Sequence, residues 1–216
     1  MCGRYTVNIG RARFEAVYQV QAPLEFASRF NLAPTQPAPI IRRAESGLEA
    51  SLVGWGLNRS GAQRGAPLIN ARAETVSQLP SFATSFRQRR CLVPATGWYE
   101  WRMIAGKKQP YYLTANDGEP LAFAGIWTPS DQGDRFSIIT TSADSAIHHI
   151  HDRMPVVLGK ERWKIWFSDA PVSELESMLE AYDAKALDFY PVSSSVGNVR
   201  NDDPKLLEQI IYSDET

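Results

Sequence analysis

The chain has 216 residues, of which 44% are hydrophobic and 11% aromatic, and its formal net charge is -1. That length and apolar content suit one folded core of ordinary size, and the sequence has no run of about 18 apolar residues that would cross a membrane. The first twenty residues include Arg11, Arg13 and Glu15 where a signal peptide would be apolar, so we expect a cytosolic protein.

The secondary structure expected along the chain alternates short strands with a few helices. Phe14, Val17 and Tyr18 have the spacing of one helix face after Gly10. Two strands, at 39–43 and 50–55, flank a hairpin turn, and an exposed loop follows at 58–67. The remaining expectations are a helix around Leu79, Phe82 and Phe86, strands at 91–94, 98–103, 111–114, 121–127, 136–141 and 154–158, and helices at 160–167 and 172–182.

Many short strands that are separated by turns and bordered by a few helices are typical of a curled sheet. The sequence shows no repeat, low-complexity linker or domain boundary. We therefore expect an α+β fold: a single domain over residues 1–216 with a curled, barrel-like mixed β-sheet and peripheral helices.

The small net charge conceals a polarised chain. Residues 59–108 carry nine Arg and Lys residues against two acids, a net +7, whereas residues 169–216 carry eleven acids against three bases, a net -8. The basic part is interleaved with Trp, Tyr and Phe, which suits single-stranded nucleic acid, with cations for phosphates and rings for bases. A solvated basic face over core aromatics explains the same pattern, and charge alone favours this second interpretation.

The second residue is a cysteine, and removal of Met1 would give Cys2 a free thiol beside a free α-amine. These groups titrate near pH ~8.5 and ~7.7 to 8.0, so both are partly reactive at neutral pH. The amine can form a Schiff base with an aldehyde, and the thiol can then close a thiazolidine ring. With Cys91 as the second of two cysteines, a disulfide framework is excluded. The alternative is that Cys2 is incidental.

The segment Gly97-Trp98-Tyr99-Glu100-Trp101 reads as a strand. Its period of two places Trp98 and Glu100 on one face and Tyr99 and Trp101 on the other. A carboxylate among large rings has a raised pKa through desolvation and can act as acid and base near neutral pH. A simple Arg pair of Glu100 on an exposed face is the competing interpretation.

All three histidines fall within residues 148–151, and histidine titrates nearest to neutral pH. His151, followed by Asp152, Arg153 and Pro155, is the best candidate for proton transfer, whereas His148 and His149 suit the surface or packing. We discount a metal site because adjacent histidines point apart and no further ligand set completes a shell.

Asn70-Ala71-Arg72-Ala73-Glu74 follows the Gly-rich loop. An Asn amide can donate to a carbonyl or sugar oxygen, and Arg72 can hold a phosphate through two hydrogen bonds. Glu74 alone suits a salt bridge or a helix cap. By itself this segment is a weak signal.

Together these segments resemble the SOS response-associated peptidase (SRAP) family, the abasic site processing proteins, over nearly the whole length. The resemblance rests on an ordered set of motifs. They are Met1-Cys2-Gly3-Arg4-Tyr5, Asn31-Leu32-Ala33-Pro34, Trp55-Gly56, Ile69-Asn70-Ala71-Arg72-Ala73-Glu74, Arg90-Cys91-Leu92-Val93-Pro94-Ala95, Gly97-Trp98-Tyr99-Glu100-Trp101, Gln109-Pro110-Tyr111, Ala124-Gly125-Ile126-Trp127, Thr140-Thr141-Ser142-Ala143, Ile150-His151-Asp152-Arg153-Met154-Pro155 and Val196-Gly197-Asn198-Val199.

The resemblance implies a sensor and shield for abasic sites in single-stranded DNA during the DNA damage response. In that family Met1 is removed, and self-cleavage by a peptidase-type reaction is one route for its removal. Cys2 then condenses with the aldehyde of the ring-opened sugar through lyase-like chemistry, which gives a thiazolidine crosslink. The implied catalytic residues are Cys2, Asn70, Glu100 and His151. The implied DNA contacts are Arg4, Asn31, Pro34, Arg72, Thr140 and Arg153. We expect a monomer without metal or cofactor, cytoplasmic and nucleoid-associated when bound to DNA.

One departure from the family concerns the loop after Trp55-Gly56, which is aromatic in the members it resembles. Here residues 57–65 have no aromatic residue and include Arg59 and Arg64. We expect weaker base stacking and a steeper salt dependence of DNA binding.

Two alternatives stay open. An N-terminal-cysteine-nucleophile amidase or peptidase would use the thiol of Cys2 with its own amine as base, although Arg4 stands where such glutaminase domains normally carry Ile. A DNA-binding module with an incidental Cys2 is the other.

Overall fold

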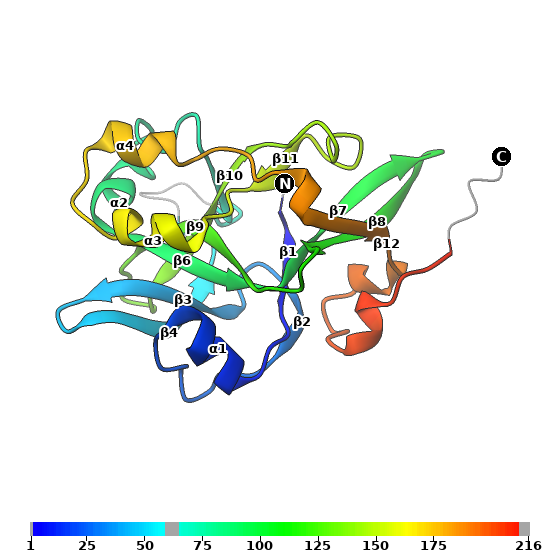
Figure 1. Ribbon diagram of the computed structural model, residues 1–216, viewed down its shortest axis with the longest axis horizontal. Coiled ribbons are helices and arrows are strands. Elements are labelled where there is room, and N and C mark those ends of the chain that lie inside the picture. The colour runs from blue at the N-terminus through cyan, green and yellow to red at the C-terminus, as the bar shows by residue number, and fades with distance from the viewer. Residues whose placement is uncertain (1, 59–64, 212–216) are drawn as a thin grey trace.

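The computed structural model describes residues 2–58 and 65–211. Within these residues the chain forms mostly β-structure (Figure 1). The strands are β1 (Arg4–Val7), β2 (Arg29–Leu32), β3 (Pro37–Ala44), β4 (Gly47–Trp55), β5 (Asn70–Arg72), β6 (Arg90–Ala95), β7 (Gly97–Ile104), β8 (Lys107–Ala115), β9 (Leu121–Thr128), β10 (Arg135–Ser142), β11 (Arg153–Pro155) and β12 (Leu187–Pro191). The helices are α1 (Arg11–Tyr18), α2 (Ala83–Gln88), α3 (Lys160–Trp166) and α4 (Val172–Ser177), with short 3-10 turns η1 (Ala184–Ala186), η2 (Ser194–Gly197) and η3 (Pro204–Leu207).

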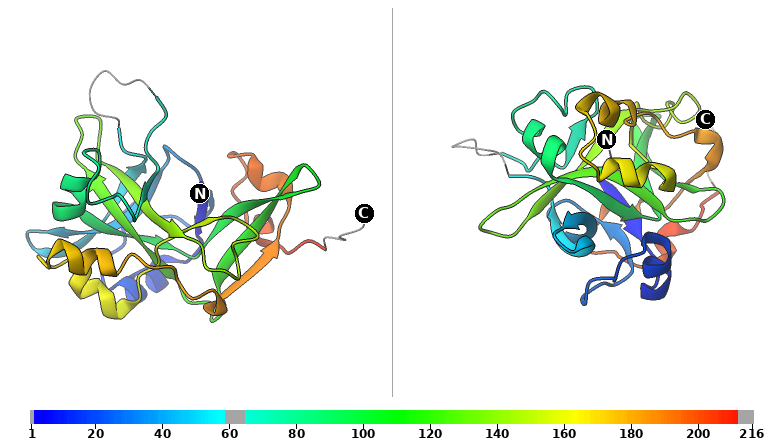
Figure 2. Two further views of the ribbon diagram at one scale, coloured as in Figure 1. Left: turned by 90° about the horizontal axis from the view of Figure 1, so that it is seen from above. Right: turned by 60° about the vertical axis from the view of Figure 1, so that its left-hand side comes forward.

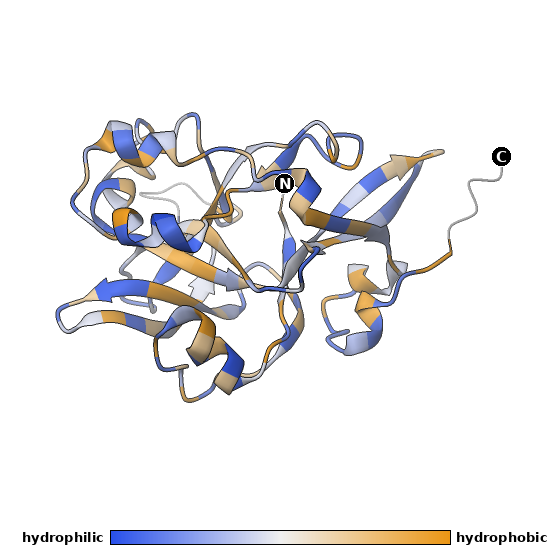
Figure 3. Cartoon of the chain, in the orientation of Figure 1, coloured by the Kyte–Doolittle hydropathy of each residue, from blue (hydrophilic) through white to orange (hydrophobic). Residues whose placement is uncertain are grey.

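The larger sheet curls into a ring. Its pairings run β10-β4-β3-β6-β9, and β9 pairs with β10 again, which closes the cycle. Beyond β4, the short strand β5 continues along β10 in the same parallel sense, and β11 covers the other end of β10. β6 is buried along its whole length, because it lies between the ring interior and the helices outside; Figure 3 shows its hydrophobic colouring.

The second sheet has the order β12-β8-β7-β1-β2. Strand β1 lies in its middle and runs between the ring and the β7–β8 hairpin, as Figures 1 and 2 show. Gly97 begins β7 where a Cβ atom would lie only 2.5 Å from the backbone oxygen of Leu113. Only glycine permits this close approach of β8. The approach fixes the position of β7 just before Trp98 and Glu100.

The core of the described residues consists of two large hydrophobic clusters and a small third one around Tyr99 and Tyr112. One fills the ring and its junction with the second sheet, and contains Cys2, Tyr5, Trp98 and Phe123. The other lies under α1, α2, α3 and α4 against the outer faces of the ring strands. Within the described residues, no helix is long and apolar enough to cross a membrane.

The predicted curled sheet with peripheral helices is confirmed, as is the hairpin, which turns between β3 and β4. The predicted strand at 154–158 and helix at 172–182 are shorter in the structure, because β11 ends at Pro155 and α4 at Ser177. Strands β1, β2, β5 and β12 were missing from the prediction. Each is five residues or fewer and depends on pairing with a distant strand. The predicted exposed loop at 58–67 falls largely on residues 59–64, outside the described residues.

Candidate active site

Cys2 lies just before β1 and is fully buried. Its backbone oxygen accepts a hydrogen bond from Nδ2 of Asn70 at 2.9 Å. Asn70 is the first residue of β5, which is held by β10 of the ring. This single hydrogen bond therefore ties the beginning of the second sheet to the ring, and it fixes the backbone of Cys2.

Glu100 reaches the same place from β7. The predicted alternation along this strand is confirmed: Trp98 packs in the cluster that contains Cys2, whereas Tyr99 and Trp101 pack in a third cluster on the opposite face. Glu100 is only 2% exposed. Burial raises its pKa to about 7, as predicted from its aromatic neighbours, so the carboxyl group exchanges a proton readily at neutral pH.

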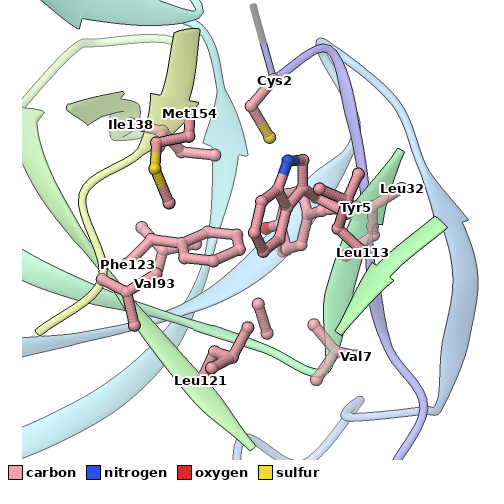
Figure 4. Packing of buried hydrophobic residues seen from close by; sticks show 14 of the residues in the cluster. Cys2, Tyr5, Val7, Leu32, Val93, Leu113, Leu121, Phe123, Ile138 and Met154 are labelled. Atoms are coloured by element: carbon pink, nitrogen blue, oxygen red, sulfur yellow. The ribbon is translucent and has the colours of Figure 1, made fainter. Parts of the chain in front are cut away.

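The thiol of Cys2 responds to the same surroundings. Burial, followed by the nearby carboxylate of Glu100, raises the pKa of this thiol well above its ordinary value. The sulfur makes only a weak contact of 3.9 Å with the backbone oxygen of Arg4. Figure 4 shows it turned into the hydrophobic cluster, on the side of Tyr5. At neutral pH the thiol is therefore protonated, and its reaction needs a group that accepts the proton.

His151 is placed by the turn that leads into β11. Its Nδ1 accepts a hydrogen bond from the backbone N–H of Arg153 at 3.0 Å, while Nε2 lies 3.9 Å from Oε2 of Glu100. This arrangement fits a neutral ring with its proton on Nε2, and burial lowers the pKa of His151 in the same direction. Asp152 lies 2.9 Å from Nδ1, so it can hold the ring when it is protonated.

The pKa shifts of Glu100 and His151 move toward each other. A carboxyl whose pKa is raised and an imidazole whose pKa is lowered are both uncharged over a shared pH range near neutrality. Transfer of a proton from Glu100 to His151 then gives a carboxylate and an imidazolium that face each other. The pair therefore supplies an acid and a base beside Cys2.

Of the expected DNA contacts, Arg72 is exposed, whereas Arg4 and Arg153 are held by the protein. Arg4 donates to Oδ1 of Asn31 at 2.8 Å and to the backbone oxygen of Val196 at 2.7 Å. Arg153 forms a two-pronged salt bridge with Glu74 and also donates to the backbone oxygen of Thr140 at 2.6 Å.

Asn31 and Thr140 are fully buried, and Pro34 is half-buried in the turn after β2. The amide of Asn31 donates to backbone oxygens of Val196, Asn198 and Asn201. It therefore anchors the segment 194–207, which we call the C-terminal wall. Asn31 and Thr140 act below the surface, by holding this wall and Arg153 respectively.

Two hollows meet at His151. The first, of about 480 Å³, is lined by Arg4, Glu100, Trp101, Lys108, His151 and Gly197. The second, of about 510 Å³, is lined by Arg72, Ser142, His148, His151, Asp152 and Arg153. A larger hollow of about 650 Å³ lies between α1, the β3–β4 hairpin and α3, away from this chemistry. We therefore take the pair of smaller hollows as the site. Among the described residues, no group of three or more His, Cys, Asp and Glu side chains is placed to hold a metal ion.

The geometry is that of a buried N-terminal cysteine with an amide clamp and an acid-base pair. Residues 1–199 match the protein family described as SOS response associated peptidase (SRAP). The chain belongs to the SRAP family. The resemblance on which the expected site was built is thereby confirmed as to family.

Relatives cover the SRAP chain almost end to end. It is similar to abasic site processing protein YoqW of Bacillus subtilis, at 33% identity over 222 residues, covering 96% of this chain and 99% of the relative. It is similar to abasic site processing protein YedK of Escherichia coli, at 31% identity over 223 residues, covering 97% and 100%.

Solved structures share its fold. A crystal structure of a protein from Bacteroides thetaiotaomicron matches with a TM-score of 0.86 at 26% identity, covering 97% of this chain and 100% of the other. A crystal structure of a protein from Bordetella bronchiseptica matches with a TM-score of 0.78 at 26% identity, covering 89% and 100%.

Sequence reasoning missed part of this SRAP site. Trp101 was assigned only to a strand face, Lys108 only to the basic region and His148 to the surface, yet each lines one of the two hollows. Gly197 was visible as part of the Val196-Gly197-Asn198-Val199 motif, but nothing in the sequence indicated that it lines the same hollow as Glu100. The hydrogen bonds of the C-terminal wall to Arg4 and Asn31 bring it there.

Proposed function

We propose that this SRAP protein captures abasic sites in single-stranded DNA through a covalent bond to Cys2. The observation that carries the proposal is the convergence of Asn70, Glu100 and His151 on Cys2. Support also comes from relatives of full length that are named abasic site processing proteins.

The reaction begins with loss of Met1, which frees the α-amine of Cys2. The amine adds to the aldehyde carbon of the ring-opened abasic sugar, and loss of water gives a Schiff base. The sulfur then attacks the same carbon: the S–C bond forms, the C=N bond becomes a single bond, and the thiol proton ends on nitrogen. The product is a thiazolidine that joins protein and DNA.

Each buried group has a role in these steps. Asn70 holds the carbonyl of Cys2, which limits rotation of the reacting residue. Glu100 accepts and returns protons during loss of water and ring closure, because its pKa lies near 7. His151, between the two hollows, exchanges a proton with Glu100 and assists opening of the sugar. Reversal of the crosslink uses the same proton path.

The strand follows the two hollows on either side of His151. Arg72 and Lys108 are exposed cations at the outer ends of this path and serve as phosphate contacts. Arg4 and Arg153 add positive potential while their hydrogen bonds keep the walls in place. Pro34, Asn31 and Thr140 support the groove.

The experiment is incubation of the protein, with Met1 removed, with single-stranded DNA that carries one abasic site. We expect a band that survives denaturation and is lost in Cys2→Ala. Reversible binding that is unchanged in Cys2→Ala would support a DNA-binding module instead. Glutamine hydrolysis without a stable band would support the amidase alternative.

A further inference from the structure

The buried hydroxyl group of Tyr5 has no role in the contacts described so far. Tyr5 is fully buried on β1, three residues after Cys2, and its ring packs edge-on against Trp55 and Phe123 at centroid distances of 5.1 and 6.1 Å. Among the described residues, its hydroxyl oxygen has no hydrogen-bond partner. Because a buried polar group without a partner costs stability, such an exception calls for an explanation.

Other buried tyrosines of the chain show how unusual this is. The hydroxyl of Tyr18 donates to the backbone oxygen of Leu121 at 2.6 Å, and that of Tyr99 donates to the backbone oxygen of Phe30 at 2.8 Å. The fold thus provides acceptors for comparable hydroxyl groups. Tyr5 differs in that its cluster also contains Cys2.

A second unpartnered donor lies next to Tyr5. Trp98 is directly opposite Tyr5 in the pairing of β1 with β7, so their side chains share one face of the sheet. Trp98 is fully buried, packs edge-on against the same Phe123 at 5.9 Å, and its indole N–H also lacks a partner among the described residues. Two hydrogen-bond donors therefore converge within the cluster that contains Cys2.

Electrostatic coupling links Tyr5 to the sulfur of Cys2. A negative charge on Cys2 is, after burial, the strongest influence that raises the pKa of Tyr5. Glu100 follows Trp98 by two residues on the same strand face and in turn raises the pKa of Cys2. Trp98 and Glu100 thus share one face of β7, Tyr5 lies opposite Trp98 on β1, and Figure 4 shows the Cys2 sulfur turned into the cluster that contains Tyr5.

We propose that the Tyr5 hydroxyl and the Trp98 indole N–H are hydrogen-bond donors that stabilise the Cys2 sulfur as it becomes anionic during thiazolidine closure. The inference rests on the proposed function, and it assigns these residues to one step of it. In that step Glu100 takes the thiol proton, the sulfur bears negative charge while it attacks the Schiff-base carbon, and the nitrogen receives the proton as the ring closes. The donors neither gain nor lose a proton.

The physical need for such donors follows from burial. Water stabilises a thiolate in solution, but the Cys2 sulfur is fully shielded from solvent, so fixed donors have to replace water. Ring packing holds both donors, and a shift of the Cys2 side chain during the reaction brings its sulfur within hydrogen-bond distance of them, since neither has the sulfur as a partner in the structure. Because the donors act on the anionic sulfur and not on the amine, we expect them to affect ring closure and to leave Schiff-base formation unchanged.

The test separates the two steps in Tyr5→Phe, which removes one oxygen atom and keeps the ring. The protein, with Met1 removed, reacts with acetaldehyde and with single-stranded DNA that carries one abasic site, and samples are quenched over time with cyanoborohydride. Reduction traps the Schiff base with the Cys2 thiol free, whereas the thiazolidine consumes it. After denaturation, alkylation followed by intact mass counts two reactive thiols in the first case and one, Cys91, in the second.

We expect Tyr5→Phe to form the Schiff base at the wild-type rate and to close the ring about tenfold more slowly, as for loss of one hydrogen bond to a charged group. Trp98→Phe should slow the same step. Tyr18→Phe is the matched control: it loses a satisfied hydrogen bond, so it should unfold at a lower temperature yet close the ring normally. Tyr5→Phe should unfold no earlier than the wild-type protein.

Ring closure at the wild-type rate in Tyr5→Phe or Trp98→Phe, with either aldehyde, would overturn the role assigned to that residue. Equal slowing of both steps would do the same, because it would indicate a general loss of structure. A wild-type protein that closes a ring with acetaldehyde but never joins abasic DNA would contradict the proposed function, while the acetaldehyde rates would still decide the role of Tyr5.

Discussion

Substitution of Glu100 by Gln measures how much folding stability the protein loses when the carboxyl group beside Cys2 ionises. Glu100 is 2% exposed, and burial raises its pKa from an ordinary 4.5 to about 7. The neutral carboxyl and the Gln amide have nearly the same shape. The variant therefore removes the ionisation of this group while it preserves most of the packing.

The sign and size of the effect follow from linkage. Because the folded protein holds the Glu100 proton more tightly than the unfolded chain, the contribution of this group to stability is full below pH 4.5 and is lost as pH rises to about 7. A pKa raised from 4.5 to 7 corresponds to about 3 kcal/mol. The free energy of unfolding of Glu100→Gln, minus that of the wild type, should thus grow by about 3 kcal/mol between pH 4.5 and pH 8.

Urea unfolding at several pH values from 4.5 to 8 measures this difference. Glu74→Gln is the matched control, because its salt bridge with Arg153 lowers the pKa of Glu74. Its pH dependence has the opposite sign: the wild-type carboxylate stabilises the fold above pH 4.5, so Glu74→Gln should lose stability there. A difference between Glu100→Gln and wild type that stays constant with pH would refute the argument that Glu100 is a buried carboxyl with a raised pKa.

Three further predictions concern the groups around Cys2 and the DNA. Asn70→Ala removes the hydrogen bond to the Cys2 carbonyl; it should lower stability by about 1 kcal/mol in thermal unfolding and slow covalent capture more than it weakens binding of intact single-stranded DNA. Asn31→Ala removes three hydrogen bonds to backbone carbonyls of the C-terminal wall, so hydrogen exchange should accelerate across this wall while exchange in β10 stays unchanged. The affinity for single-stranded DNA should fall steeply as salt concentration rises. In the double variant Arg59→Ala, Arg64→Ala, the slope of the logarithm of the binding constant against the logarithm of salt concentration should become shallower by about 0.7 for each phosphate that these arginines no longer neutralise. A flat slope in the wild-type protein would contradict the expected role of the loop at 57–65.

Local patterns in the sequence predicted the parts of the fold that depend on near neighbours. The β3–β4 hairpin followed from its turn residues, and the burial of Glu100 followed from alternation with large rings. The short strands β1, β2 and β5 escaped prediction because their pairing partners lie far away in the sequence. β1, for example, pairs with β7 through Tyr5 and Trp98, more than ninety residues apart.

The candidate site shows the same limit. Residue chemistry singled out Cys2, Glu100 and His151 one by one, but only the family resemblance joined them with Asn70 into one site, since no local pattern indicates that residues 2 and 70 share a hydrogen bond. The resemblance also suggested Asn31 and Thr140 as DNA contacts, whereas tertiary packing buries both side chains. The unpartnered hydroxyl of Tyr5 could be recognised only once the partners of every buried donor were known.

The measurement that tests the central claim most directly is the intact mass of the product formed with single-stranded DNA containing one abasic site. The account predicts a species equal to the protein without Met1 plus the DNA minus one water, with only the Cys91 thiol left to alkylate, and no such species from Cys2→Ser. A stable adduct that forms equally in Cys2→Ser, or one in which both thiols remain free, would contradict it.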